Sequence, residues 1–242
     1  MAARATGMQS KAKKAAYFTL ILFFIMFLFS VAAEGIYYAY LLATGVSAQG
    51  AYQLLQSNTA MLEYVLTAAA SFSFSAAALL YLRFVDKSRK PLSVRLGLSA
   101  SRLTFRNIGL GLLLFAVILA FEALVSAASG AAGVSIQTNV NLLLTGAPAW
   151  FLIFTVFLAP INEEVLFRGL MVPRIGIVAS AILFALPHIT YDSTFAIEVI
   201  AALLFGVLAG YVYRKTGSLY ASITAHMLVN ALPVLALLLL SV

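Results

Sequence analysis

The chain is built from apolar segments that are each close to the length needed to cross a bilayer, with most of the charge in the connections between them. An α-helix needs about 20 mainly apolar residues to span the hydrocarbon core. Seven segments meet or approach this length: Tyr17–Leu42, Met61–Phe84, Ile108–Ser129, Pro148–Met171, Ile175–Thr190, Phe195–Tyr213 and Leu219–Leu240. The fifth is short, and Pro187 is expected to kink it. We therefore expect an all-α, polytopic bundle of about seven spans, forming a single transmembrane domain over residues 1–242.

The composition excludes several classes of protein. Of the 242 residues, 63% are hydrophobic and 10% are charged, so the chain has too little polar surface to cover a soluble globule. A soluble enzyme, a disordered tail and a nucleic-acid-binding module are excluded, and the lipid bilayer is the implied surrounding. The lack of cysteine also excludes disulfides and thiolate-bound metals.

The 15 Lys and Arg residues predict the orientation. Four precede the first span, seven lie between the second and third, two lie at the end of the fourth span and just after it, and two follow the sixth. The loops 43–60, 130–147 and 191–194 contain none. The positive-inside rule therefore places the N-terminus in the cytoplasm. The basic stretch Ser88–Phe105 is predicted to be either an amphipathic piece on the cytoplasmic surface or a solvated loop.

The first span is interpreted as a retained anchor. Val31-Ala32-Ala33 resembles a signal-peptidase site, but the apolar stretch before it is long for a signal peptide. The compact length favours a multi-pass protein of a prokaryotic plasma membrane.

Several polar residues fall inside the predicted spans, where a carboxylate costs about 3 kcal/mol. The fourth span contains Glu163 and Glu164, and the only two histidines, His188 and His226, lie in the fifth and seventh, with Asn230 one turn after His226. Counted from the basic edge at about 1.5 Å per residue, Glu163, His188 and His226 lie roughly 16, 21 and 16 Å deep. The sequence thus predicts one polar layer that opens toward the cytoplasm. The alternative is a hydrogen-bond network that only fixes helix packing.

The spacing within the helices indicates separate roles. Glu164 and Arg168 share a helix face and can pair, whereas Glu163 points about 100° away. Pro160 leaves a main-chain carbonyl unpaired in the preceding turn, which we expect to admit water. Gly206-x-x-x-Gly210 predicts close packing, within the bundle in preference to a dimer.

This set of groups fits the addition of water to an amide carbonyl. A desolvated glutamate beside a neutral imidazole can take a proton from water, and a second histidine with an asparagine can donate to the developing oxyanion. Other intramembrane hydrolase sites are excluded, because the chain has no G-x-S-x-G, no H-E-x-x-H and only two aspartates, Asp86 in the basic loop and Asp192.

Three motifs resemble those of the CAAX prenyl endopeptidase and bacteriocin-processing (CPBP, or Abi) family. They are E-E-x-x-x-R at Glu163–Arg168, F-x-x-x-H at Phe184–His188 and H-x-x-x-N at His226–Asn230. The resemblance covers about residues 162–231 and implies an intramembrane endopeptidase whose catalytic core lies at residues 148–241. Its substrate would be a membrane-associated peptide or lipidated protein, with prenylated CAAX-type peptides as one class.

The resemblance also implies roles for the residues. Glu163 and His188 would activate water, His226 and Asn230 would form the oxyanion site, and Glu164 and Arg168 would orient it. No cofactor is firmly implied, but Glu163, His188 and His226 could together bind a divalent metal such as zinc.

Two other functions remain open. One is a non-catalytic membrane protein of bacteriocin immunity or secretion scaffolding that uses the same residues structurally. The other is a proton-coupled transporter, which is less favoured because the two halves of the chain show no inverted repeat.

Overall fold

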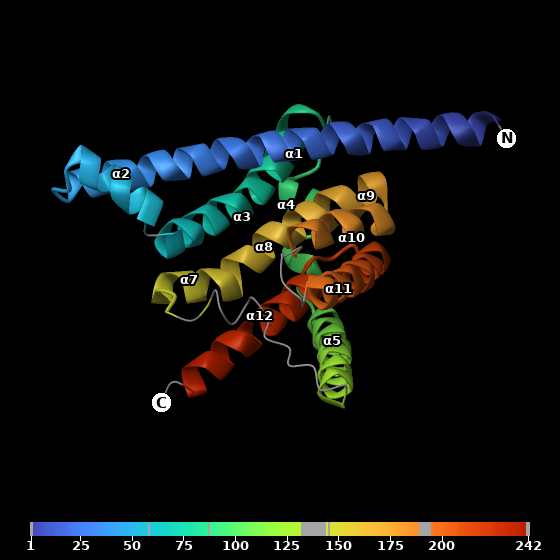
Figure 1. Cartoon of the computed structure of the whole chain (residues 1–242). Helices are drawn as coiled ribbons and strands as arrows, with labels where there is room; N and C mark the ends of the chain where they lie inside the picture. Colours follow the sequence, from blue (N-terminus) through green and yellow to red (C-terminus); the bar gives the residue numbers. More distant parts are fainter. Residues whose placement is uncertain are drawn as a thin grey trace. The chain divides into compact units, whose positions relative to one another are not determined.

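The computed structural model describes residues 2–57, 59–86, 88–131, 144, 146–188 and 195–240, and within these ranges every regular element is helical. Figure 1 shows the helices as coiled ribbons. The predicted all-helical fold is confirmed for the described residues. The loop 191–194 and most of the loop 130–147 lie outside them, as does Asp192.

Among the described residues, six helices are long and apolar enough to cross a membrane, so the chain is an integral membrane protein. They are Phe24–Ala43, Met61–Phe84, Phe105–Ala131, Ala149–Ile175, Ile197–Thr216 and Tyr220–Leu239. The predicted fifth span corresponds to a shorter apolar helical segment, Ile177–His188. In it, α10 (Ile177–Ala185) gives way to a 3-10 turn at Leu186–His188 that contains Pro187. The orientation of the termini stays a prediction.

The chain divides into two compact units, Met1–Val85 and Asp86–Val242, and each is described by itself. In the first unit, α1 (Ala2–Ala43) packs along α3 (Thr59–Phe84), and α2 (Ala48–Ser57) contacts both. The expected single domain with a catalytic core at residues 148–241 stays a prediction.

In the second unit, two helix pairs are brought close together by glycines. α5 (Phe105–Ala131) packs against α12 (Tyr220–Leu240) at Gly111, and α10 packs against α11 (Phe195–Thr216). At Gly206 an added Cβ would lie 2.9 Å from the Cβ of Ala181, and at Gly210 it would lie 3.0 Å from Ile177 Cγ2. The Gly206-x-x-x-Gly210 motif therefore packs inside the bundle, against α10.

Gly111 is the glycine whose replacement we expect to loosen the bundle. A Cβ at this position would lie 2.6 Å from the backbone oxygen of Ala221, so Gly111→Ala forces α5 away from α12. We expect the free energy of unfolding to fall by about 1–3 kcal/mol, which is typical of overpacking. Gly109→Ala is the matched control, because nothing lies within 4 Å of its Cβ position. Thermal unfolding in detergent should show a lower Tm for the first variant alone, and equal Tm values would contradict this account.

The basic stretch after residue 86 is folded against the rest of the second unit, and its expected position at the cytoplasmic surface stays a prediction. It forms α4 (Leu92–Leu96) and a 3-10 turn at Ala100–Arg102. Leu96 is buried, and its Cδ2 lies close to Gly169 in the fourth span. The stretch is tied to the α11–α12 turn by a hydrogen bond from the Leu219 N–H to the Gly97 carbonyl, and by another from the Arg102 guanidinium to the Thr216 carbonyl.

Candidate functional site

The helix that carries the two adjacent glutamates is irregular. Between α7 (Ala149–Ile153) and α9 (Val172–Ile175) it contains two π-helical segments, Phe154–Leu158 and Val165–Met171, on either side of α8 (Ala159–Glu164). The last π-type bond of the first segment runs from the Ala159 N–H to the Phe154 carbonyl, and the residue after it is Pro160. The second segment ends in the same way, with the Val172 N–H bonded to Phe167 and Pro173 next. Each π segment therefore stops where a proline removes the next N–H donor. Segments of this kind often mark functional sites.

Glu164 and Arg168 form the predicted pair at the centre of the unit. Arg168 Nη1 donates to Glu164 Oε1 at 2.8 Å, and the two side chains are 1% and 0% exposed. The guanidinium also lies against two aromatic rings, with its Cζ 4.1 Å from the centroid of Phe184 and 4.9 Å from that of Phe205. Cation–π contacts of this kind strengthen when they are desolvated. Arg168 is thus held by three groups from three helices.

His226 lies between the two glutamates. Its Nδ1 donates to the same oxygen of Glu164, at 3.0 Å, and its Nε2 lies 3.8 Å from Oε2 of Glu163. The Glu163 side chain is 18% exposed, whereas Glu164 is fully enclosed. The arrangement leaves Glu163 as the carboxylate that water or a ligand can reach, and Glu164 as the one that fixes the imidazole.

His188 lies at the end of the short fifth span. Its Nδ1 donates to the Phe184 carbonyl at 3.0 Å, and its ring contacts the Phe184 ring at a centroid distance of 5.1 Å. A neutral imidazole whose Nδ1 carries the proton has its lone pair on Nε2. The Phe184 ring also contacts His226, at 5.7 Å. Within the described part of the chain, no hydrogen bond or ion pair joins Glu163 to His188.

Asn230 lies one turn beyond His226 on α12. Its Nδ2 donates to the Thr155 carbonyl at 3.0 Å. The sequence predicted an unpaired carbonyl before Pro160 that would admit water. The Thr155 carbonyl is the one freed in this way, and a side chain from another helix is bonded to it.

The described residues do not form a metal site. No three His, Asp or Glu side chains among them lie close enough together to hold an ion. The arrangement of Glu163, His188 and His226 therefore does not fit the zinc alternative.

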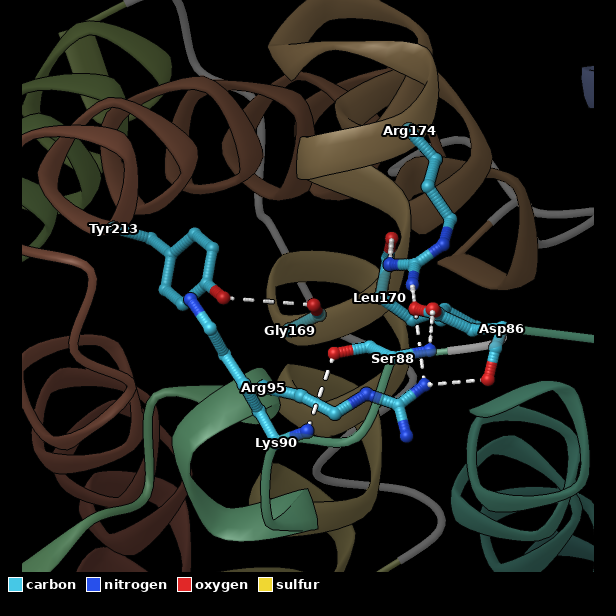
Figure 2. A network of polar contacts seen from close by, with 8 residues as sticks. All are labelled: Asp86, Ser88, Lys90, Arg95, Gly169, Leu170, Arg174 and Tyr213. Carbon is cyan, nitrogen blue, oxygen red and sulfur yellow. Dashed lines mark hydrogen bonds and ion pairs between the residues drawn. The ribbon is translucent and has the colours of Figure 1, made fainter. Parts of the chain in front are cut away.

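A second polar network braces the far end of the same helix (Figure 2). Oδ2 of Asp86 pairs with Arg95 at 2.9 Å and with Arg174 at 2.6 Å, and Arg174 also donates to the Leu170 carbonyl. The hydrogen bond from Arg95, followed by that from the Ser88 N–H, holds the pKa of the Asp86 carboxyl below its usual value. Through Asp86, the network ties the basic stretch to α9, directly after the second π segment.

Some of these partners were missed from the sequence. Phe205 directly precedes the Gly206-x-x-x-Gly210 motif but is not part of it, and Asp86 was treated only as a loop residue. Pro160 was the one available signal for the Thr155 carbonyl, but nothing in the sequence identified the donor as Asn230.

Comparison with known proteins supports the resemblance. Residues 145–232 match the family model described as type II CAAX prenyl endopeptidase Rce1-like, and this segment contains all six candidate site residues. The chain is also 32% identical over 80 residues to the uncharacterized protein YpbD of Bacillus subtilis (strain 168). That match covers 33% of this chain and 42% of YpbD. No solved structure matches the chain. The resemblance stated from the three motifs is thereby confirmed for this segment.

Proposed function

From the match of residues 145–232 to type II CAAX prenyl endopeptidases, we propose that this chain is an intramembrane endopeptidase. The observation that carries the proposal is the position of His226 between a buried, Arg168-paired glutamate and the partly accessible Glu163. Such a carboxylate–imidazole–carboxylate row is expensive inside an apolar bundle. It provides a proton acceptor and a hydrogen-bond donor side by side, which the hydrolysis of an amide requires.

In the proposed reaction, Glu163 accepts a proton from water while the water oxygen bonds to the amide carbon. Nε2 of His188, which its Nδ1–H bond leaves as an acceptor, orients the same water. The carbonyl oxygen becomes an oxyanion and accepts hydrogen bonds from His226 and Asn230. When the oxyanion collapses, the C–N bond breaks and Glu163 returns its proton to the leaving nitrogen. The products are a carboxyl group and an amine, so water is consumed and no other reactant is needed.

Glu164 and Arg168 act as positioning residues in this scheme. Glu164 holds Nδ1–H of His226, so Nε2 of the ring faces Glu163 and the reacting atoms. In its protonated form His226 donates from both nitrogens, with Nδ1–H to Glu164 and Nε2–H to the oxyanion. Arg168 provides the cation that pairs with Glu164 inside the apolar unit.

The surroundings of the site support a membrane-associated substrate. All six residues lie within or at the end of apolar helices, so the scissile bond must be brought to the bilayer. We propose membrane-associated peptides or lipidated proteins as substrates, with prenylated CAAX-type peptides as the first to test. We further propose a prokaryotic plasma membrane, with the site opening toward the cytoplasm.

One observation favours a second function, that of a non-catalytic protein in bacteriocin immunity or secretion. Glu164, Arg168, His226 and Asn230 all have partners within the chain. A network that only fixes helix packing would look similar. The two functions differ in whether the protein cleaves anything.

Purified protein in liposomes, given a farnesylated CAAX peptide with a fluorophore and quencher on either side of the scissile bond, tests the proposal. We expect wild-type cleavage, and for His188→Gln a kcat lower by about 100-fold, within the range for acid–base groups. Glu122→Gln is the control, because Glu122 is also a carboxylate inside a span but is exposed on α5. Cleavage should survive exhaustive chelation. No cleavage of any membrane-associated peptide by the wild type would favour the scaffold function.

A further inference from the structure

Thr155 has a main-chain carbonyl that cannot be satisfied by its own helix. The π segment Phe154–Leu158 is defined by bonds from an N–H to the carbonyl five residues earlier, and at its end Ala159 donates to Phe154 in this way. The next donor in that series would be residue 160, which is a proline and has no N–H. In a regular α-helix the Ala159 N–H would donate to the Thr155 carbonyl, but here it is already bonded to the Phe154 carbonyl. An unpaired carbonyl inside a bundle costs free energy, so a donor is required.

The donor is Asn230, on another helix. Its Nδ2 lies 3.0 Å from the Thr155 oxygen across the contact between α12 and the π segment. The carboxamide carries two N–H groups on Nδ2 and is planar. When one N–H is fixed on Thr155, the plane of the amide is fixed, and with it the direction of the second N–H.

We infer that Pro160 is a positioning residue, which acts by leaving the Thr155 carbonyl free to orient the Asn230 amide for the oxyanion. This inference rests on the proposed endopeptidase function. It explains why the helix that carries Glu163 is irregular one turn before the glutamate. A regular helix would satisfy the Thr155 carbonyl itself, and Asn230 would then have no fixed partner.

The second π segment provides a comparison within the same helix. It also ends before a proline, Pro173, and two of the carbonyls near its end are bonded to side chains that are not part of the site. The Gly169 carbonyl accepts from Tyr213, and the Leu170 carbonyl accepts from Arg174 (Figure 2). Pro173→Ala is therefore the matched control for the effect of removing a proline from this helix.

The test combines kinetics with a thermodynamic cycle on the full-length protein. In Pro160→Ala, residue 160 regains an N–H that can pair with Thr155 and release Asn230. We expect kcat to fall at least about tenfold with KM nearly unchanged, because a small misplacement of a reacting group costs this much. Pro173→Ala should keep kcat within about twofold. Pro160→Val, which keeps more of the buried volume, serves if Pro160→Ala does not fold.

The thermodynamic cycle measures the contact without any substrate. Asn230→Ala should lower the Tm of the wild type, because it leaves the Thr155 carbonyl unpaired. In the Pro160→Ala background the same substitution should lower Tm by less than half as much. If Asn230→Ala lowered Tm equally in the wild type and in the Pro160→Ala variant, the inference would be overturned.

The two arms separate the possible failures. If the wild type cleaves peptides and Pro160→Ala keeps its kcat, the positioning role is wrong and the proposed function stands. If the wild type cleaves nothing, the proposed function fails, and with it the positioning role. The cycle would then still decide whether Pro160 makes Asn230 the partner of Thr155.

Discussion

Replacing Glu163 by glutamine should lower kcat by about 1,000-fold or more while the protein remains folded. Glutamine has nearly the same shape, but its amide cannot accept a proton from water and return it to the leaving nitrogen. The loss of a general base costs about 100- to 10,000-fold. Among the described residues, Oε2 of Glu163 meets Nε2 of His226 at 3.8 Å, which is longer than a hydrogen bond, so we expect little change in stability.

Initial rates on the farnesylated peptide in liposomes measure this effect, with Tm measured in parallel. Glu122→Gln makes the same chemical change elsewhere in a span and should leave kcat intact. Retention of more than about a tenth of wild-type kcat by Glu163→Gln would remove Glu163 from the mechanism. A large fall in Tm would instead show that Glu163 supports the fold.

Replacing Arg168 by methionine should destabilise the second unit by about 3–5 kcal/mol, the usual cost of breaking a buried ion pair. The substitution leaves Glu164, which is 0% exposed, without its cation and removes the guanidinium from between Phe184 and Phe205. His226 remains as a donor to Glu164, but a single imidazole does not replace the permanent charge of the guanidinium.

Two comparisons make this prediction specific. Arg174→Met breaks the ion pair between Arg174 and Asp86, two side chains that are 25% and 27% exposed. We expect this substitution to lower the free energy of unfolding by no more than about 1 kcal/mol. Adding Glu164→Gln to Arg168→Met removes the uncompensated charge and should restore part of the lost stability. Chemical unfolding in detergent measures all three variants. Equal losses for Arg168→Met and Arg174→Met would show that burial does not decide the strength of these pairs.

The sequence predicted those features that depend on one helix at a time. The spans and the shortness of the fifth follow from the length of apolar runs, the kink in the fifth follows from Pro187 inside it, and the pairing of Glu164 with Arg168 follows from their spacing of four. These relations hold for any helix in any bundle. For this reason they could be stated without knowing which helices are neighbours.

The sequence could not predict relations that depend on how helices are rotated against each other. Depth arithmetic placed Glu163, His188 and His226 at similar levels, but it gave no facing directions. The structure brings His226 close to Glu163 and bonds His188 to its own helix instead. The roles of Asp86 and Phe205 were hidden for the same reason, since their partners lie on other elements.

The π segments also could not be predicted from the sequence. A proline predicts a missing donor, but not whether the preceding turn widens to i+5 bonds or simply bends. That choice depends on whether a neighbouring helix offers a donor for the freed carbonyl. At Thr155 the donor is Asn230, 75 residues away in the sequence.

The short fifth helix has a consequence for the surrounding lipid. Its 12 residues, Ile177–His188, cover about 20 Å, well short of the roughly 30 Å hydrocarbon core. One side of it, at Val178, Ile182 and Leu186, is exposed to the surroundings. Such a hydrophobic mismatch draws headgroups inward and thins the bilayer beside the protein. The polar end of a lipid-anchored chain then has a shorter distance to travel to the level of His188 than it would beside a full-length helix.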